Sequence, residues 1–160
     1  MAYLIDTNLL LRSVEPHHSM YGDTVNAISI LGGAGIELFI TSQNLVEFWR
    51  SATRPVERNG LGLIIVEAEA ELQRLETLFP VLPDVPEIYL EWRRIVLQYG
   101  VLGVNVHDAR LVAVMLVHGL THILTFNTED FTRYSGEITP IHPRLPLYIL
   151  HPLRLKQELF

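Results

Sequence analysis

The chain has 160 residues, no cysteine, an apolar fraction of 49% and a formal net charge of −6 at pH 7. This length and composition favour a single globular domain and argue against disorder. No apolar run approaches the length of a membrane span, about 20 residues, and the early Asp6 with no basic region before it argues against a signal peptide. The lack of cysteine excludes disulfides and thiolate metal sites and fits a cytoplasmic protein, and the acidic charge argues against broad nonspecific nucleic-acid binding.

Strands are predicted from short apolar runs, and helices from apolar residues that recur at helical spacing. In the first half of the chain we expect a strand at 3–5, a short helix at 8–11, a helix at 19–31 that is stopped by Gly32, Gly33 and Gly35, and a strand at 38–40. A helix that is capped by Ser42 and ended by Arg54-Pro55 and a loop at 56–62 should follow.

The second half continues the alternation. We expect an amphipathic helix at 63–78 with the apolar stripe Ile65, Ala68, Leu72, Leu75 and Phe79, a short strand at 79–82, a helix that is capped by Asp84 and followed by Gly100, a very apolar helix at 107–118 that is closed by Gly119, and strands at 123–126 and 138–141. This order predicts an α/β layered fold with a mostly parallel sheet in one domain, residues 1–160. The apolar residues at 143–160 are expected to pack on this domain or on a dimer partner.

Acidic and amide side chains recur where a strand pattern gives way to a helix pattern, or soon after. Asp6 follows the first strand, Glu47 lies in the helix after the second, Asp108 opens the most apolar helix, and Asn127 and Asp130 follow the last clear strand. Taken singly, each has an ordinary explanation as a helix cap, a turn residue or half of a surface ion pair. In an open parallel sheet, however, they would gather beyond the carboxyl ends of the strands. Clustered carboxylates repel one another unless they hold cations, so together they predict a divalent metal site.

Basic and aromatic side chains near these positions could contact a polyanion. Eleven of the twelve basic residues are arginine, which suits bidentate phosphate contacts. The candidates for a local phosphate track are Arg50, Arg54, Arg58, Arg110 and Arg133. Trp49 could stack on a base, although its place on the apolar stripe of its helix favours core packing, and His107 is interpreted as structural.

The order of the acidic positions and their flanking sequences resemble a PIN domain and, within that family, the VapC type of toxin ribonuclease. The resemblance spans residues 3–142 and is carried by four segments, Ile5-Asp6-Thr7-Asn8, Asn44-Leu45-Val46-Glu47-Phe48-Trp49, Val106-His107-Asp108-Ala109-Arg110 and Thr125-Phe126-Asn127-Thr128-Glu129-Asp130-Phe131. Each motif is short and individually unspecific, whereas four in this order are fairly specific. The resemblance implies a three-layer α/β/α sandwich and a Mg²⁺- or Mn²⁺-dependent endoribonuclease that hydrolyses RNA.

The resemblance also assigns roles to individual residues. The metal would be held by Asp6, Glu47 and Asp108, the catalytic set would add Asp130, and the supporting residues would be Thr7, Asn8, Asn127 and Arg110. Our hypothesis makes Asp6 and Asp108 the main ligands, with Glu47 binding the metal directly or through water. The fourth acidic position is ambiguous, because an amide stands at Asn127 and the nearby carboxylate is Asp130.

A toxin of this family implies two protein partners, a small antitoxin and a second copy of the chain. The antitoxin could block the site and occupy an apolar groove near Val56–Phe79. Two other readings stay open, namely a catalytically degenerate PIN-like binding module and a nuclease that matures RNA without a toxin role.

Three other enzyme classes fit the sequence poorly. A haloacid-dehalogenase-type phosphatase needs an aspartate where Asn8 stands and a lysine in its site, whereas the only lysine here is Lys156 in the tail. A P-loop nucleotidase lacks its Gly-Lys signature, and a dinucleotide-binding domain lacks its glycine fingerprint after a strand.

Overall fold

The fold is built on a central sheet of five strands, and the computed structural model describes residues 1–146. In chain order the strands are β1 (Ala2–Ile5), β2 (Glu37–Thr41), β3 (Val81–Leu82), β4 (His122–Leu124) and β5 (Thr139–Ile141). They lie side by side in the order β3-β2-β1-β4-β5, and every neighbouring pair is parallel. The predicted parallel sheet is confirmed, with β5 at one edge. Of the tail that was expected to pack at 143–160, residues 147–160 lie outside the described part.

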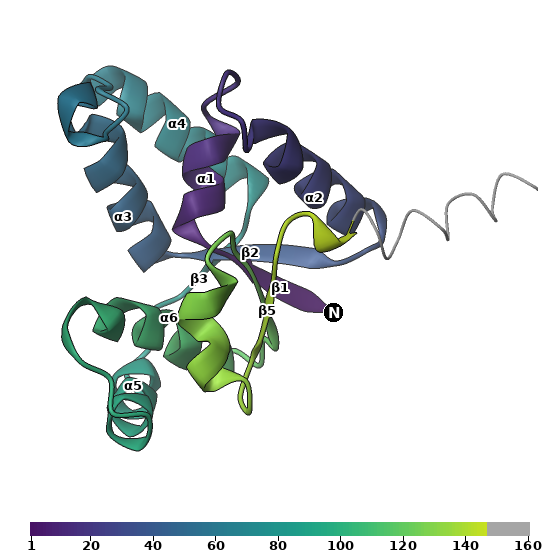
Figure 1. Ribbon diagram of the computed structural model, residues 1–160, viewed down its shortest axis with the longest axis vertical. Coiled ribbons are helices and arrows are strands. Elements are labelled where there is room, and N and C mark those ends of the chain that lie inside the picture. Colours follow the sequence, from purple (N-terminus) through teal and green to yellow (C-terminus); the bar gives the residue numbers. More distant parts are fainter. Residues whose placement is uncertain (147–160) are drawn as a thin grey trace, which may run out of the picture.

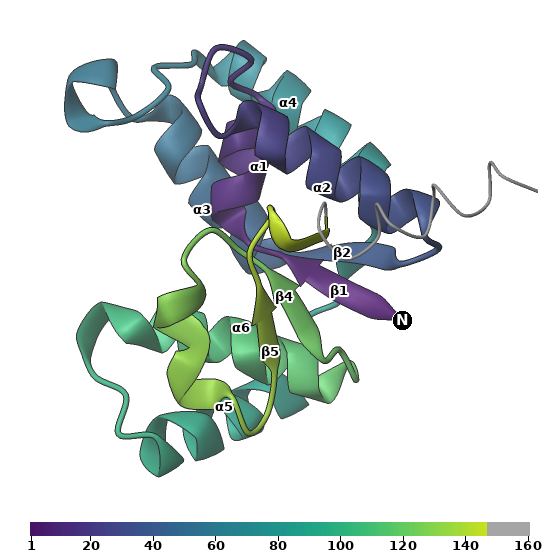
Figure 2. The same cartoon turned by 45° about the vertical axis from the view of Figure 1, so that its right-hand side comes forward.

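Helices cover both faces of this sheet. The α-helices are α1 (Thr7–Ser13), α2 (Tyr21–Gly33), α3 (Ser42–Thr53), α4 (Ile65–Leu78), α5 (Glu87–Gln98) and α6 (Val106–Val117), and the 3₁₀ helices are η1 (Val56–Arg58), η2 (Gly103–Asn105) and η3 (Thr128–Tyr134). Helices α1 to α4 lie on one face, and α5, α6 and η3 lie on the other (Figures 1 and 2). The α/β/α sandwich is therefore confirmed. Within residues 1–146, no helix has the length and apolar character needed to cross a membrane.

The two layers have separate hydrophobic cores because successive side chains of a strand point to opposite faces. In β1, Leu4 packs into the core beneath α5 and α6, whereas Tyr3 and Ile5 pack into the core beneath α1 to α4. Leu4 and Ile5 are both fully buried. Burying a side chain of this size stabilises the fold by roughly 1.5–3 kcal/mol, so the carboxyl-terminal end of β1 is packed firmly on both faces of the sheet.

The strand order creates a crevice next to β1. After β1 the chain moves outwards through β2 and β3, and it then returns through α5 and α6 to pair β4 with the other side of β1. The segments that leave β1 and β4 turn to opposite faces, since α1 belongs to one layer and η3 to the other. Ligand sites of open α/β sheets form at such a divergence, outside the carboxyl ends of the strands.

The predicted start of α3 is wrong by one residue. Thr41, rather than Ser42, is the N-cap, and its hydroxyl accepts a hydrogen bond from the Asn44 backbone N–H at 3.1 Å. The Asn44 side chain accepts from the Thr41 backbone N–H at 2.9 Å, which completes a capping box. The box fixes the first turn of α3 and hence the direction of its next turn.

Two further local predictions are wrong. Asp84 does not cap α5, because Pro86 stands at the N-cap position and the carboxylate of Asp84 bonds to Ser42 and Arg110 instead. Ile65 was expected in the apolar stripe of α4, yet it is 72% exposed. It is the first residue of α4, one turn before Ala68, the first buried residue of the helix.

Candidate active site

A cleft of about 610 Å³ opens at the carboxyl edge of the sheet beside β1. Its lining includes all eight side chains that the sequence proposed for the site, namely Asp6, Thr7, Asn8, Glu47, Asp108, Arg110, Asn127 and Asp130. They come from segments that are up to about 120 residues apart in sequence and belong to both helical layers. The fold therefore brings the whole set to one cavity.

Asp6 lies at the N-cap of α1, directly beyond β1, and is only 8% exposed. Its Oδ1 accepts from the Thr7 backbone N–H at 2.7 Å, and its Oδ2 accepts from the Thr125 hydroxyl at 2.7 Å and the Asn8 amide at 3.0 Å. Burial raises the pKa of Asp6 to about 6, with smaller contributions from the charges of Asp108 and Glu47, although its hydrogen bonds oppose this rise. Asp6 therefore caps α1 and is also a buried acid, whose charged form is disfavoured by desolvation and by the neighbouring carboxylates.

Glu47 lies in the second turn of α3, and each of its carboxylate oxygens accepts one hydrogen bond. The Thr7 hydroxyl donates to Oε2 at 2.8 Å, and the Gln43 amide donates to Oε1 at 2.8 Å. The Asn44 amide in turn donates to the Thr7 hydroxyl at 3.1 Å. Among the described residues no basic side chain forms an ion pair with Glu47, so the alternative of a surface salt bridge is wrong.

Asp108 lies in the first turn of α6 and is half-buried. Burial, together with the nearby charges of Asp130 and Glu47, raises the pKa of Asp108 to about 6, while the charge of Arg133 opposes this rise. Within residues 1–146 the Asp108 carboxylate has no hydrogen-bond donor and no ion-pair partner. A carboxylate that is partly desolvated, beside other carboxylates and without a donor is an unfavourable arrangement that a cation would relieve.

Asn127 and Asp130 are exposed at the start of η3. The Asn127 backbone N–H donates to the Thr125 hydroxyl at 3.0 Å, and the Asp130 backbone N–H donates to the Asn127 carbonyl at 3.1 Å. This turn brings the Asp130 carboxylate close enough to raise the pKa of Asp108. The segment after β4 thus contributes one charge to the cleft.

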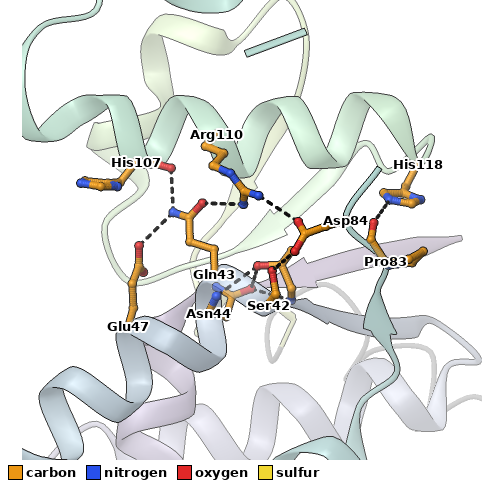
Figure 3. A network of polar contacts seen from close by, with 10 residues as sticks. Ser42, Gln43, Asn44, Glu47, Pro83, Asp84, His107, Arg110 and His118 are labelled. Atoms are coloured by element: carbon orange, nitrogen blue, oxygen red, sulfur yellow. Dashed lines mark hydrogen bonds and ion pairs between the residues drawn. The ribbon is translucent and has the colours of Figure 1, made fainter. Parts of the chain in front are cut away.

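Two residues of the site escaped sequence analysis. Thr125 donates a hydrogen bond to Asp6. Its position follows from the register that pairs Ile5 with Leu124, because each residue then follows its strand at the same level, but this register can be used only if β4 is known to lie beside β1. Gln43 binds Glu47, and its only signal is a spacing of four residues on one helix. Figure 3 shows Gln43 between α3 and α6, with its amide directed towards Glu47, His107 and Arg110.

The predicted phosphate track is only partly assembled. Arg50 and Arg110 line the cleft. Arg110 is already engaged, since it donates to Gln43 at 3.2 Å and to Asp84 at 2.8 Å. Trp49 is half-buried and does not line the cleft, which is unfavourable to base stacking in this cavity.

The donors in the cleft suit a hard divalent cation in their chemistry, because they are carboxylate, amide and hydroxyl oxygens. They do not form a closed site, since within residues 1–146 no three His, Asp or Glu side chains stand close enough together to hold a metal ion. Mg²⁺ commonly keeps several of its waters and binds through one or two carboxylates. The residues present therefore fit a hydrated ion rather than an ion enclosed by protein ligands.

Comparisons with known proteins agree with this architecture. VapBC2 from Rickettsia felis, solved bound to a DNA fragment from its promoter, has a TM-score of 0.65 at 14% identity and covers 89% of this chain and 98% of its own. VapBC-1 from nontypeable Haemophilus influenzae has a TM-score of 0.61 at 15% identity, with coverage of 89% and 98%. PAE2754 from Pyrobaculum aerophilum has a TM-score of 0.59 at 19% identity, with coverage of 95% and 96%. Such low identities establish the fold alone.

A comparison with curated proteins gives no significant match. The family model described as "PIN domain" matches residues 3–137, which include all the candidate site residues. The resemblance seen in the four motifs is thus confirmed, and the chain belongs to the PIN domain family.

Proposed function

We propose that this protein is a metal-dependent ribonuclease that hydrolyses phosphodiester bonds in RNA. The observation that supports this most strongly is the meeting of Asp6, Glu47, Asp108 and Asp130 in one cleft, although they lie on four separate segments. Two of these carboxylates have a pKa raised to about 6, which reflects desolvation and mutual repulsion. Perturbed acids in a cleft are typical of functional sites, and membership of the PIN family supports the same activity.

Each residue has a distinct role in this proposal. Asp6 and Asp108 would hold Mg²⁺ or Mn²⁺, with Glu47 binding directly or through a water molecule. When bound, such an ion polarises a scissile phosphate and makes a coordinated water more acidic. Thr7 keeps Asp6 and Glu47 apart at a fixed spacing, because its backbone N–H donates to the one and its hydroxyl to the other.

The segment after β4 would complete the site. Asp130 is the better candidate for the fourth acidic position, because its charge acts on Asp108 whereas the amide of Asn127 carries none. Asp130 would orient the attacking water, and Asn8 would hold this segment to β1 through Thr125, to which its amide donates at 3.2 Å. The exposed Arg50 would contact a phosphate of the RNA.

The proposal includes a small antitoxin as partner. Its support is the fold shared with the VapBC proteins and an apolar groove of about 640 Å³ between α2, β2 and the end of α4. The groove is lined in part by Val25, Ile28, Leu38, Leu78 and Phe79, so only its α4 side belongs to the expected region Val56–Phe79. An apolar segment of the antitoxin would occupy it. A homodimer and a cytoplasmic site of action belong to the same proposal.

Single-turnover cleavage of RNA with Mn²⁺ and with EDTA tests the activity. Asp108→Asn should reduce cleavage by about 100-fold or more, since even outer partners of a metal site are worth about 10- to 100-fold. Glu129→Gln is the control, because Glu129 is an exposed acid of η3, next to Asp130, and does not line the cleft. Cleavage by Asp108→Asn at the rate of the control would refute the assignment.

A second candidate function is a PIN-like module that binds a partner without catalysis. It is favoured by the lack of a complete three-carboxylate metal site in residues 1–146. A wild-type protein that neither cleaves RNA nor gains thermal stability with Mn²⁺ would establish this alternative. Growth arrest on expression, relieved by a co-expressed antitoxin, separates a toxin from a nuclease that matures RNA.

A further inference from the structure

A polar bridge joins α3 to α6 through Gln43 (Figure 3), one of the residues that line the cleft. The side-chain amide of Gln43 donates to Glu47 Oε1 at 2.8 Å and to the backbone carbonyl of His107 at 2.9 Å. Helix α3 packs in the core on one face of the sheet, and α6 packs in the core on the other. The bridge therefore ties a carboxylate of one layer to the residue that precedes Asp108 in the other layer.

Arg110 gives this amide a single favourable orientation. Its guanidinium donates to Gln43 Oε1 at 3.2 Å, and an arginine has donors only. If the amide were flipped, its oxygen would face two acceptors, the Glu47 carboxylate and the His107 carbonyl, and its NH₂ group would face a cation. The amide nitrogen is thereby directed at Glu47.

Arg110 is itself held by Asp84. The guanidinium donates to Asp84 Oδ1 at 2.8 Å, and the Ser42 hydroxyl donates to Asp84 Oδ2. The hydrogen bond from Ser42, which has the larger effect, and the one from Arg110 lower the pKa of Asp84. The neighbouring carbonyl of Pro83 contacts His118 Nε2 at 2.9 Å, so the segment that carries Asp84 is fastened to the far end of α6.

We propose that Gln43 is a positioning residue of the active site, and that Arg110 acts through it rather than on the substrate. Gln43 fixes one oxygen of Glu47 relative to the first turn of α6, and Thr7 fixes the other oxygen. Glu47 and Asp108 are therefore set at their working separation before a metal or RNA binds. The catalytic consequence rests on the proposed nuclease function, whereas the bridge between the layers does not.

The primary test replaces Gln43 with methionine, which keeps the length of the side chain and removes the amide. For Gln43→Met we expect about a 10- to 100-fold loss in kcat and in Mn²⁺ affinity, as for other residues that orient metal ligands, with the KM for RNA nearly unchanged. Gln43→Glu keeps the size but cannot donate, and it should show the same loss. Gln73→Met is the control, because Gln73 donates to Glu69 at 3.0 Å on the exposed face of α4, and it should match the wild type.

Arg110 distinguishes orientation from substrate binding. If Arg110 orients Gln43, Arg110→Met should lower kcat. The kcat of the double variant with Gln43→Met should then be no lower than that of the more impaired single variant. If Arg110 instead contacted a phosphate of the RNA, Arg110→Met would raise KM, and its effect would multiply with that of Gln43→Met in the double variant. The second pattern would overturn the role assigned to Arg110 here.

Amide hydrogen exchange tests the bridge without any activity. In the metal-free protein, Gln43→Met should speed hydrogen exchange at the α6 amides that bond to carbonyls of the first turn of α6. The expected increase is about 5- to 10-fold, the effect of one lost hydrogen bond. Gln73→Met should leave these amides unchanged. If the wild type neither cleaves RNA nor binds Mn²⁺, the nuclease proposal fails, and the bridge is then tested by the hydrogen-exchange rates alone. Unchanged exchange in both variants would overturn it.

Discussion

The buried carboxyl group of Asp6 should make the stability of the metal-free protein depend on pH. Its pKa is about 6 in the folded chain, raised by burial and by the charges of Asp108 and Glu47, against an ordinary value of 3.8. Between these two values the folded state binds a proton that the unfolded state has released. The stabilisation is therefore fully present below about pH 4, and it is lost as the pH rises through about 6.

The expected size of the effect follows from the two pKa values. A rise from 3.8 to about 6 corresponds to about 3 kcal/mol of unfolding free energy. Little of this is screened by solvent, since Asp6 is only 8% exposed. Asp108 acts in the same direction, but its greater exposure reduces its share. The loss is a large part of the roughly 5–15 kcal/mol that holds a domain together.

Urea unfolding in EDTA, followed from about pH 4 to about pH 8, measures this loss when the wild type is compared with Asp6→Asn. The asparagine keeps the shape of the side chain and cannot ionise, so the wild type should lose about 3 kcal/mol more than the variant over this range. The comparison uses slopes, because Asn also alters the hydrogen bonds to Thr125 and Asn8. Parallel pH profiles for the two proteins would refute the reasoning.

Three substitutions outside the carboxylate cluster, one of them paired with a control variant, test the packing, turns and caps that position it. Phe48→Ala should cost about 3–5 kcal/mol in urea unfolding, because Phe48 is fully buried beside Glu47, and a cost below about 1 kcal/mol would contradict the packing. Gly119→Ala should lower stability by about 1–2 kcal/mol, because Gly119 has a φ of 74°, which disfavours a residue with a Cβ. In the described part of the chain no atom lies within 4 Å of the added Cβ, so this backbone strain is the whole expected cost, and an unchanged Tm would show that the turn is not left-handed. Thr41→Ala should cost about 1 kcal/mol through loss of the α3 cap, whereas Ser42→Ala should leave that capping box intact.

The gathering of Asp6, Glu47 and Asp108 could be expected from the sequence. Parallel strands present their carboxyl ends at one edge, so residues that follow strands, or open a helix leading back to the sheet, meet there. The local pattern of apolar residues was sufficient to locate each of these positions.

Other features depend on partners that are distant in sequence. The bond from Thr125 to Asp6 requires β4 to lie beside β1, and strand order is not written in any local pattern. Asp84 was expected to cap a helix, but a charged partner, Arg110, competes for its carboxylate, and hydrogen bonds between charged groups are the stronger kind. The only sequence signal of the role of Gln43 is its spacing of four residues from Glu47, because a glutamine on a half-exposed helix face is otherwise ordinary.

The central claim is that the carboxylates of the cleft share a divalent ion. Anomalous scattering from a crystal grown with Mn²⁺ tests this most directly. We expect a peak in the cleft, within coordination distance of Asp108 and Asp6, with water completing the shell, and no such peak in Asp108→Asn. A wild-type map with no peak in the cleft at saturating Mn²⁺, or with Mn²⁺ bound only at other acidic surfaces, would contradict the account.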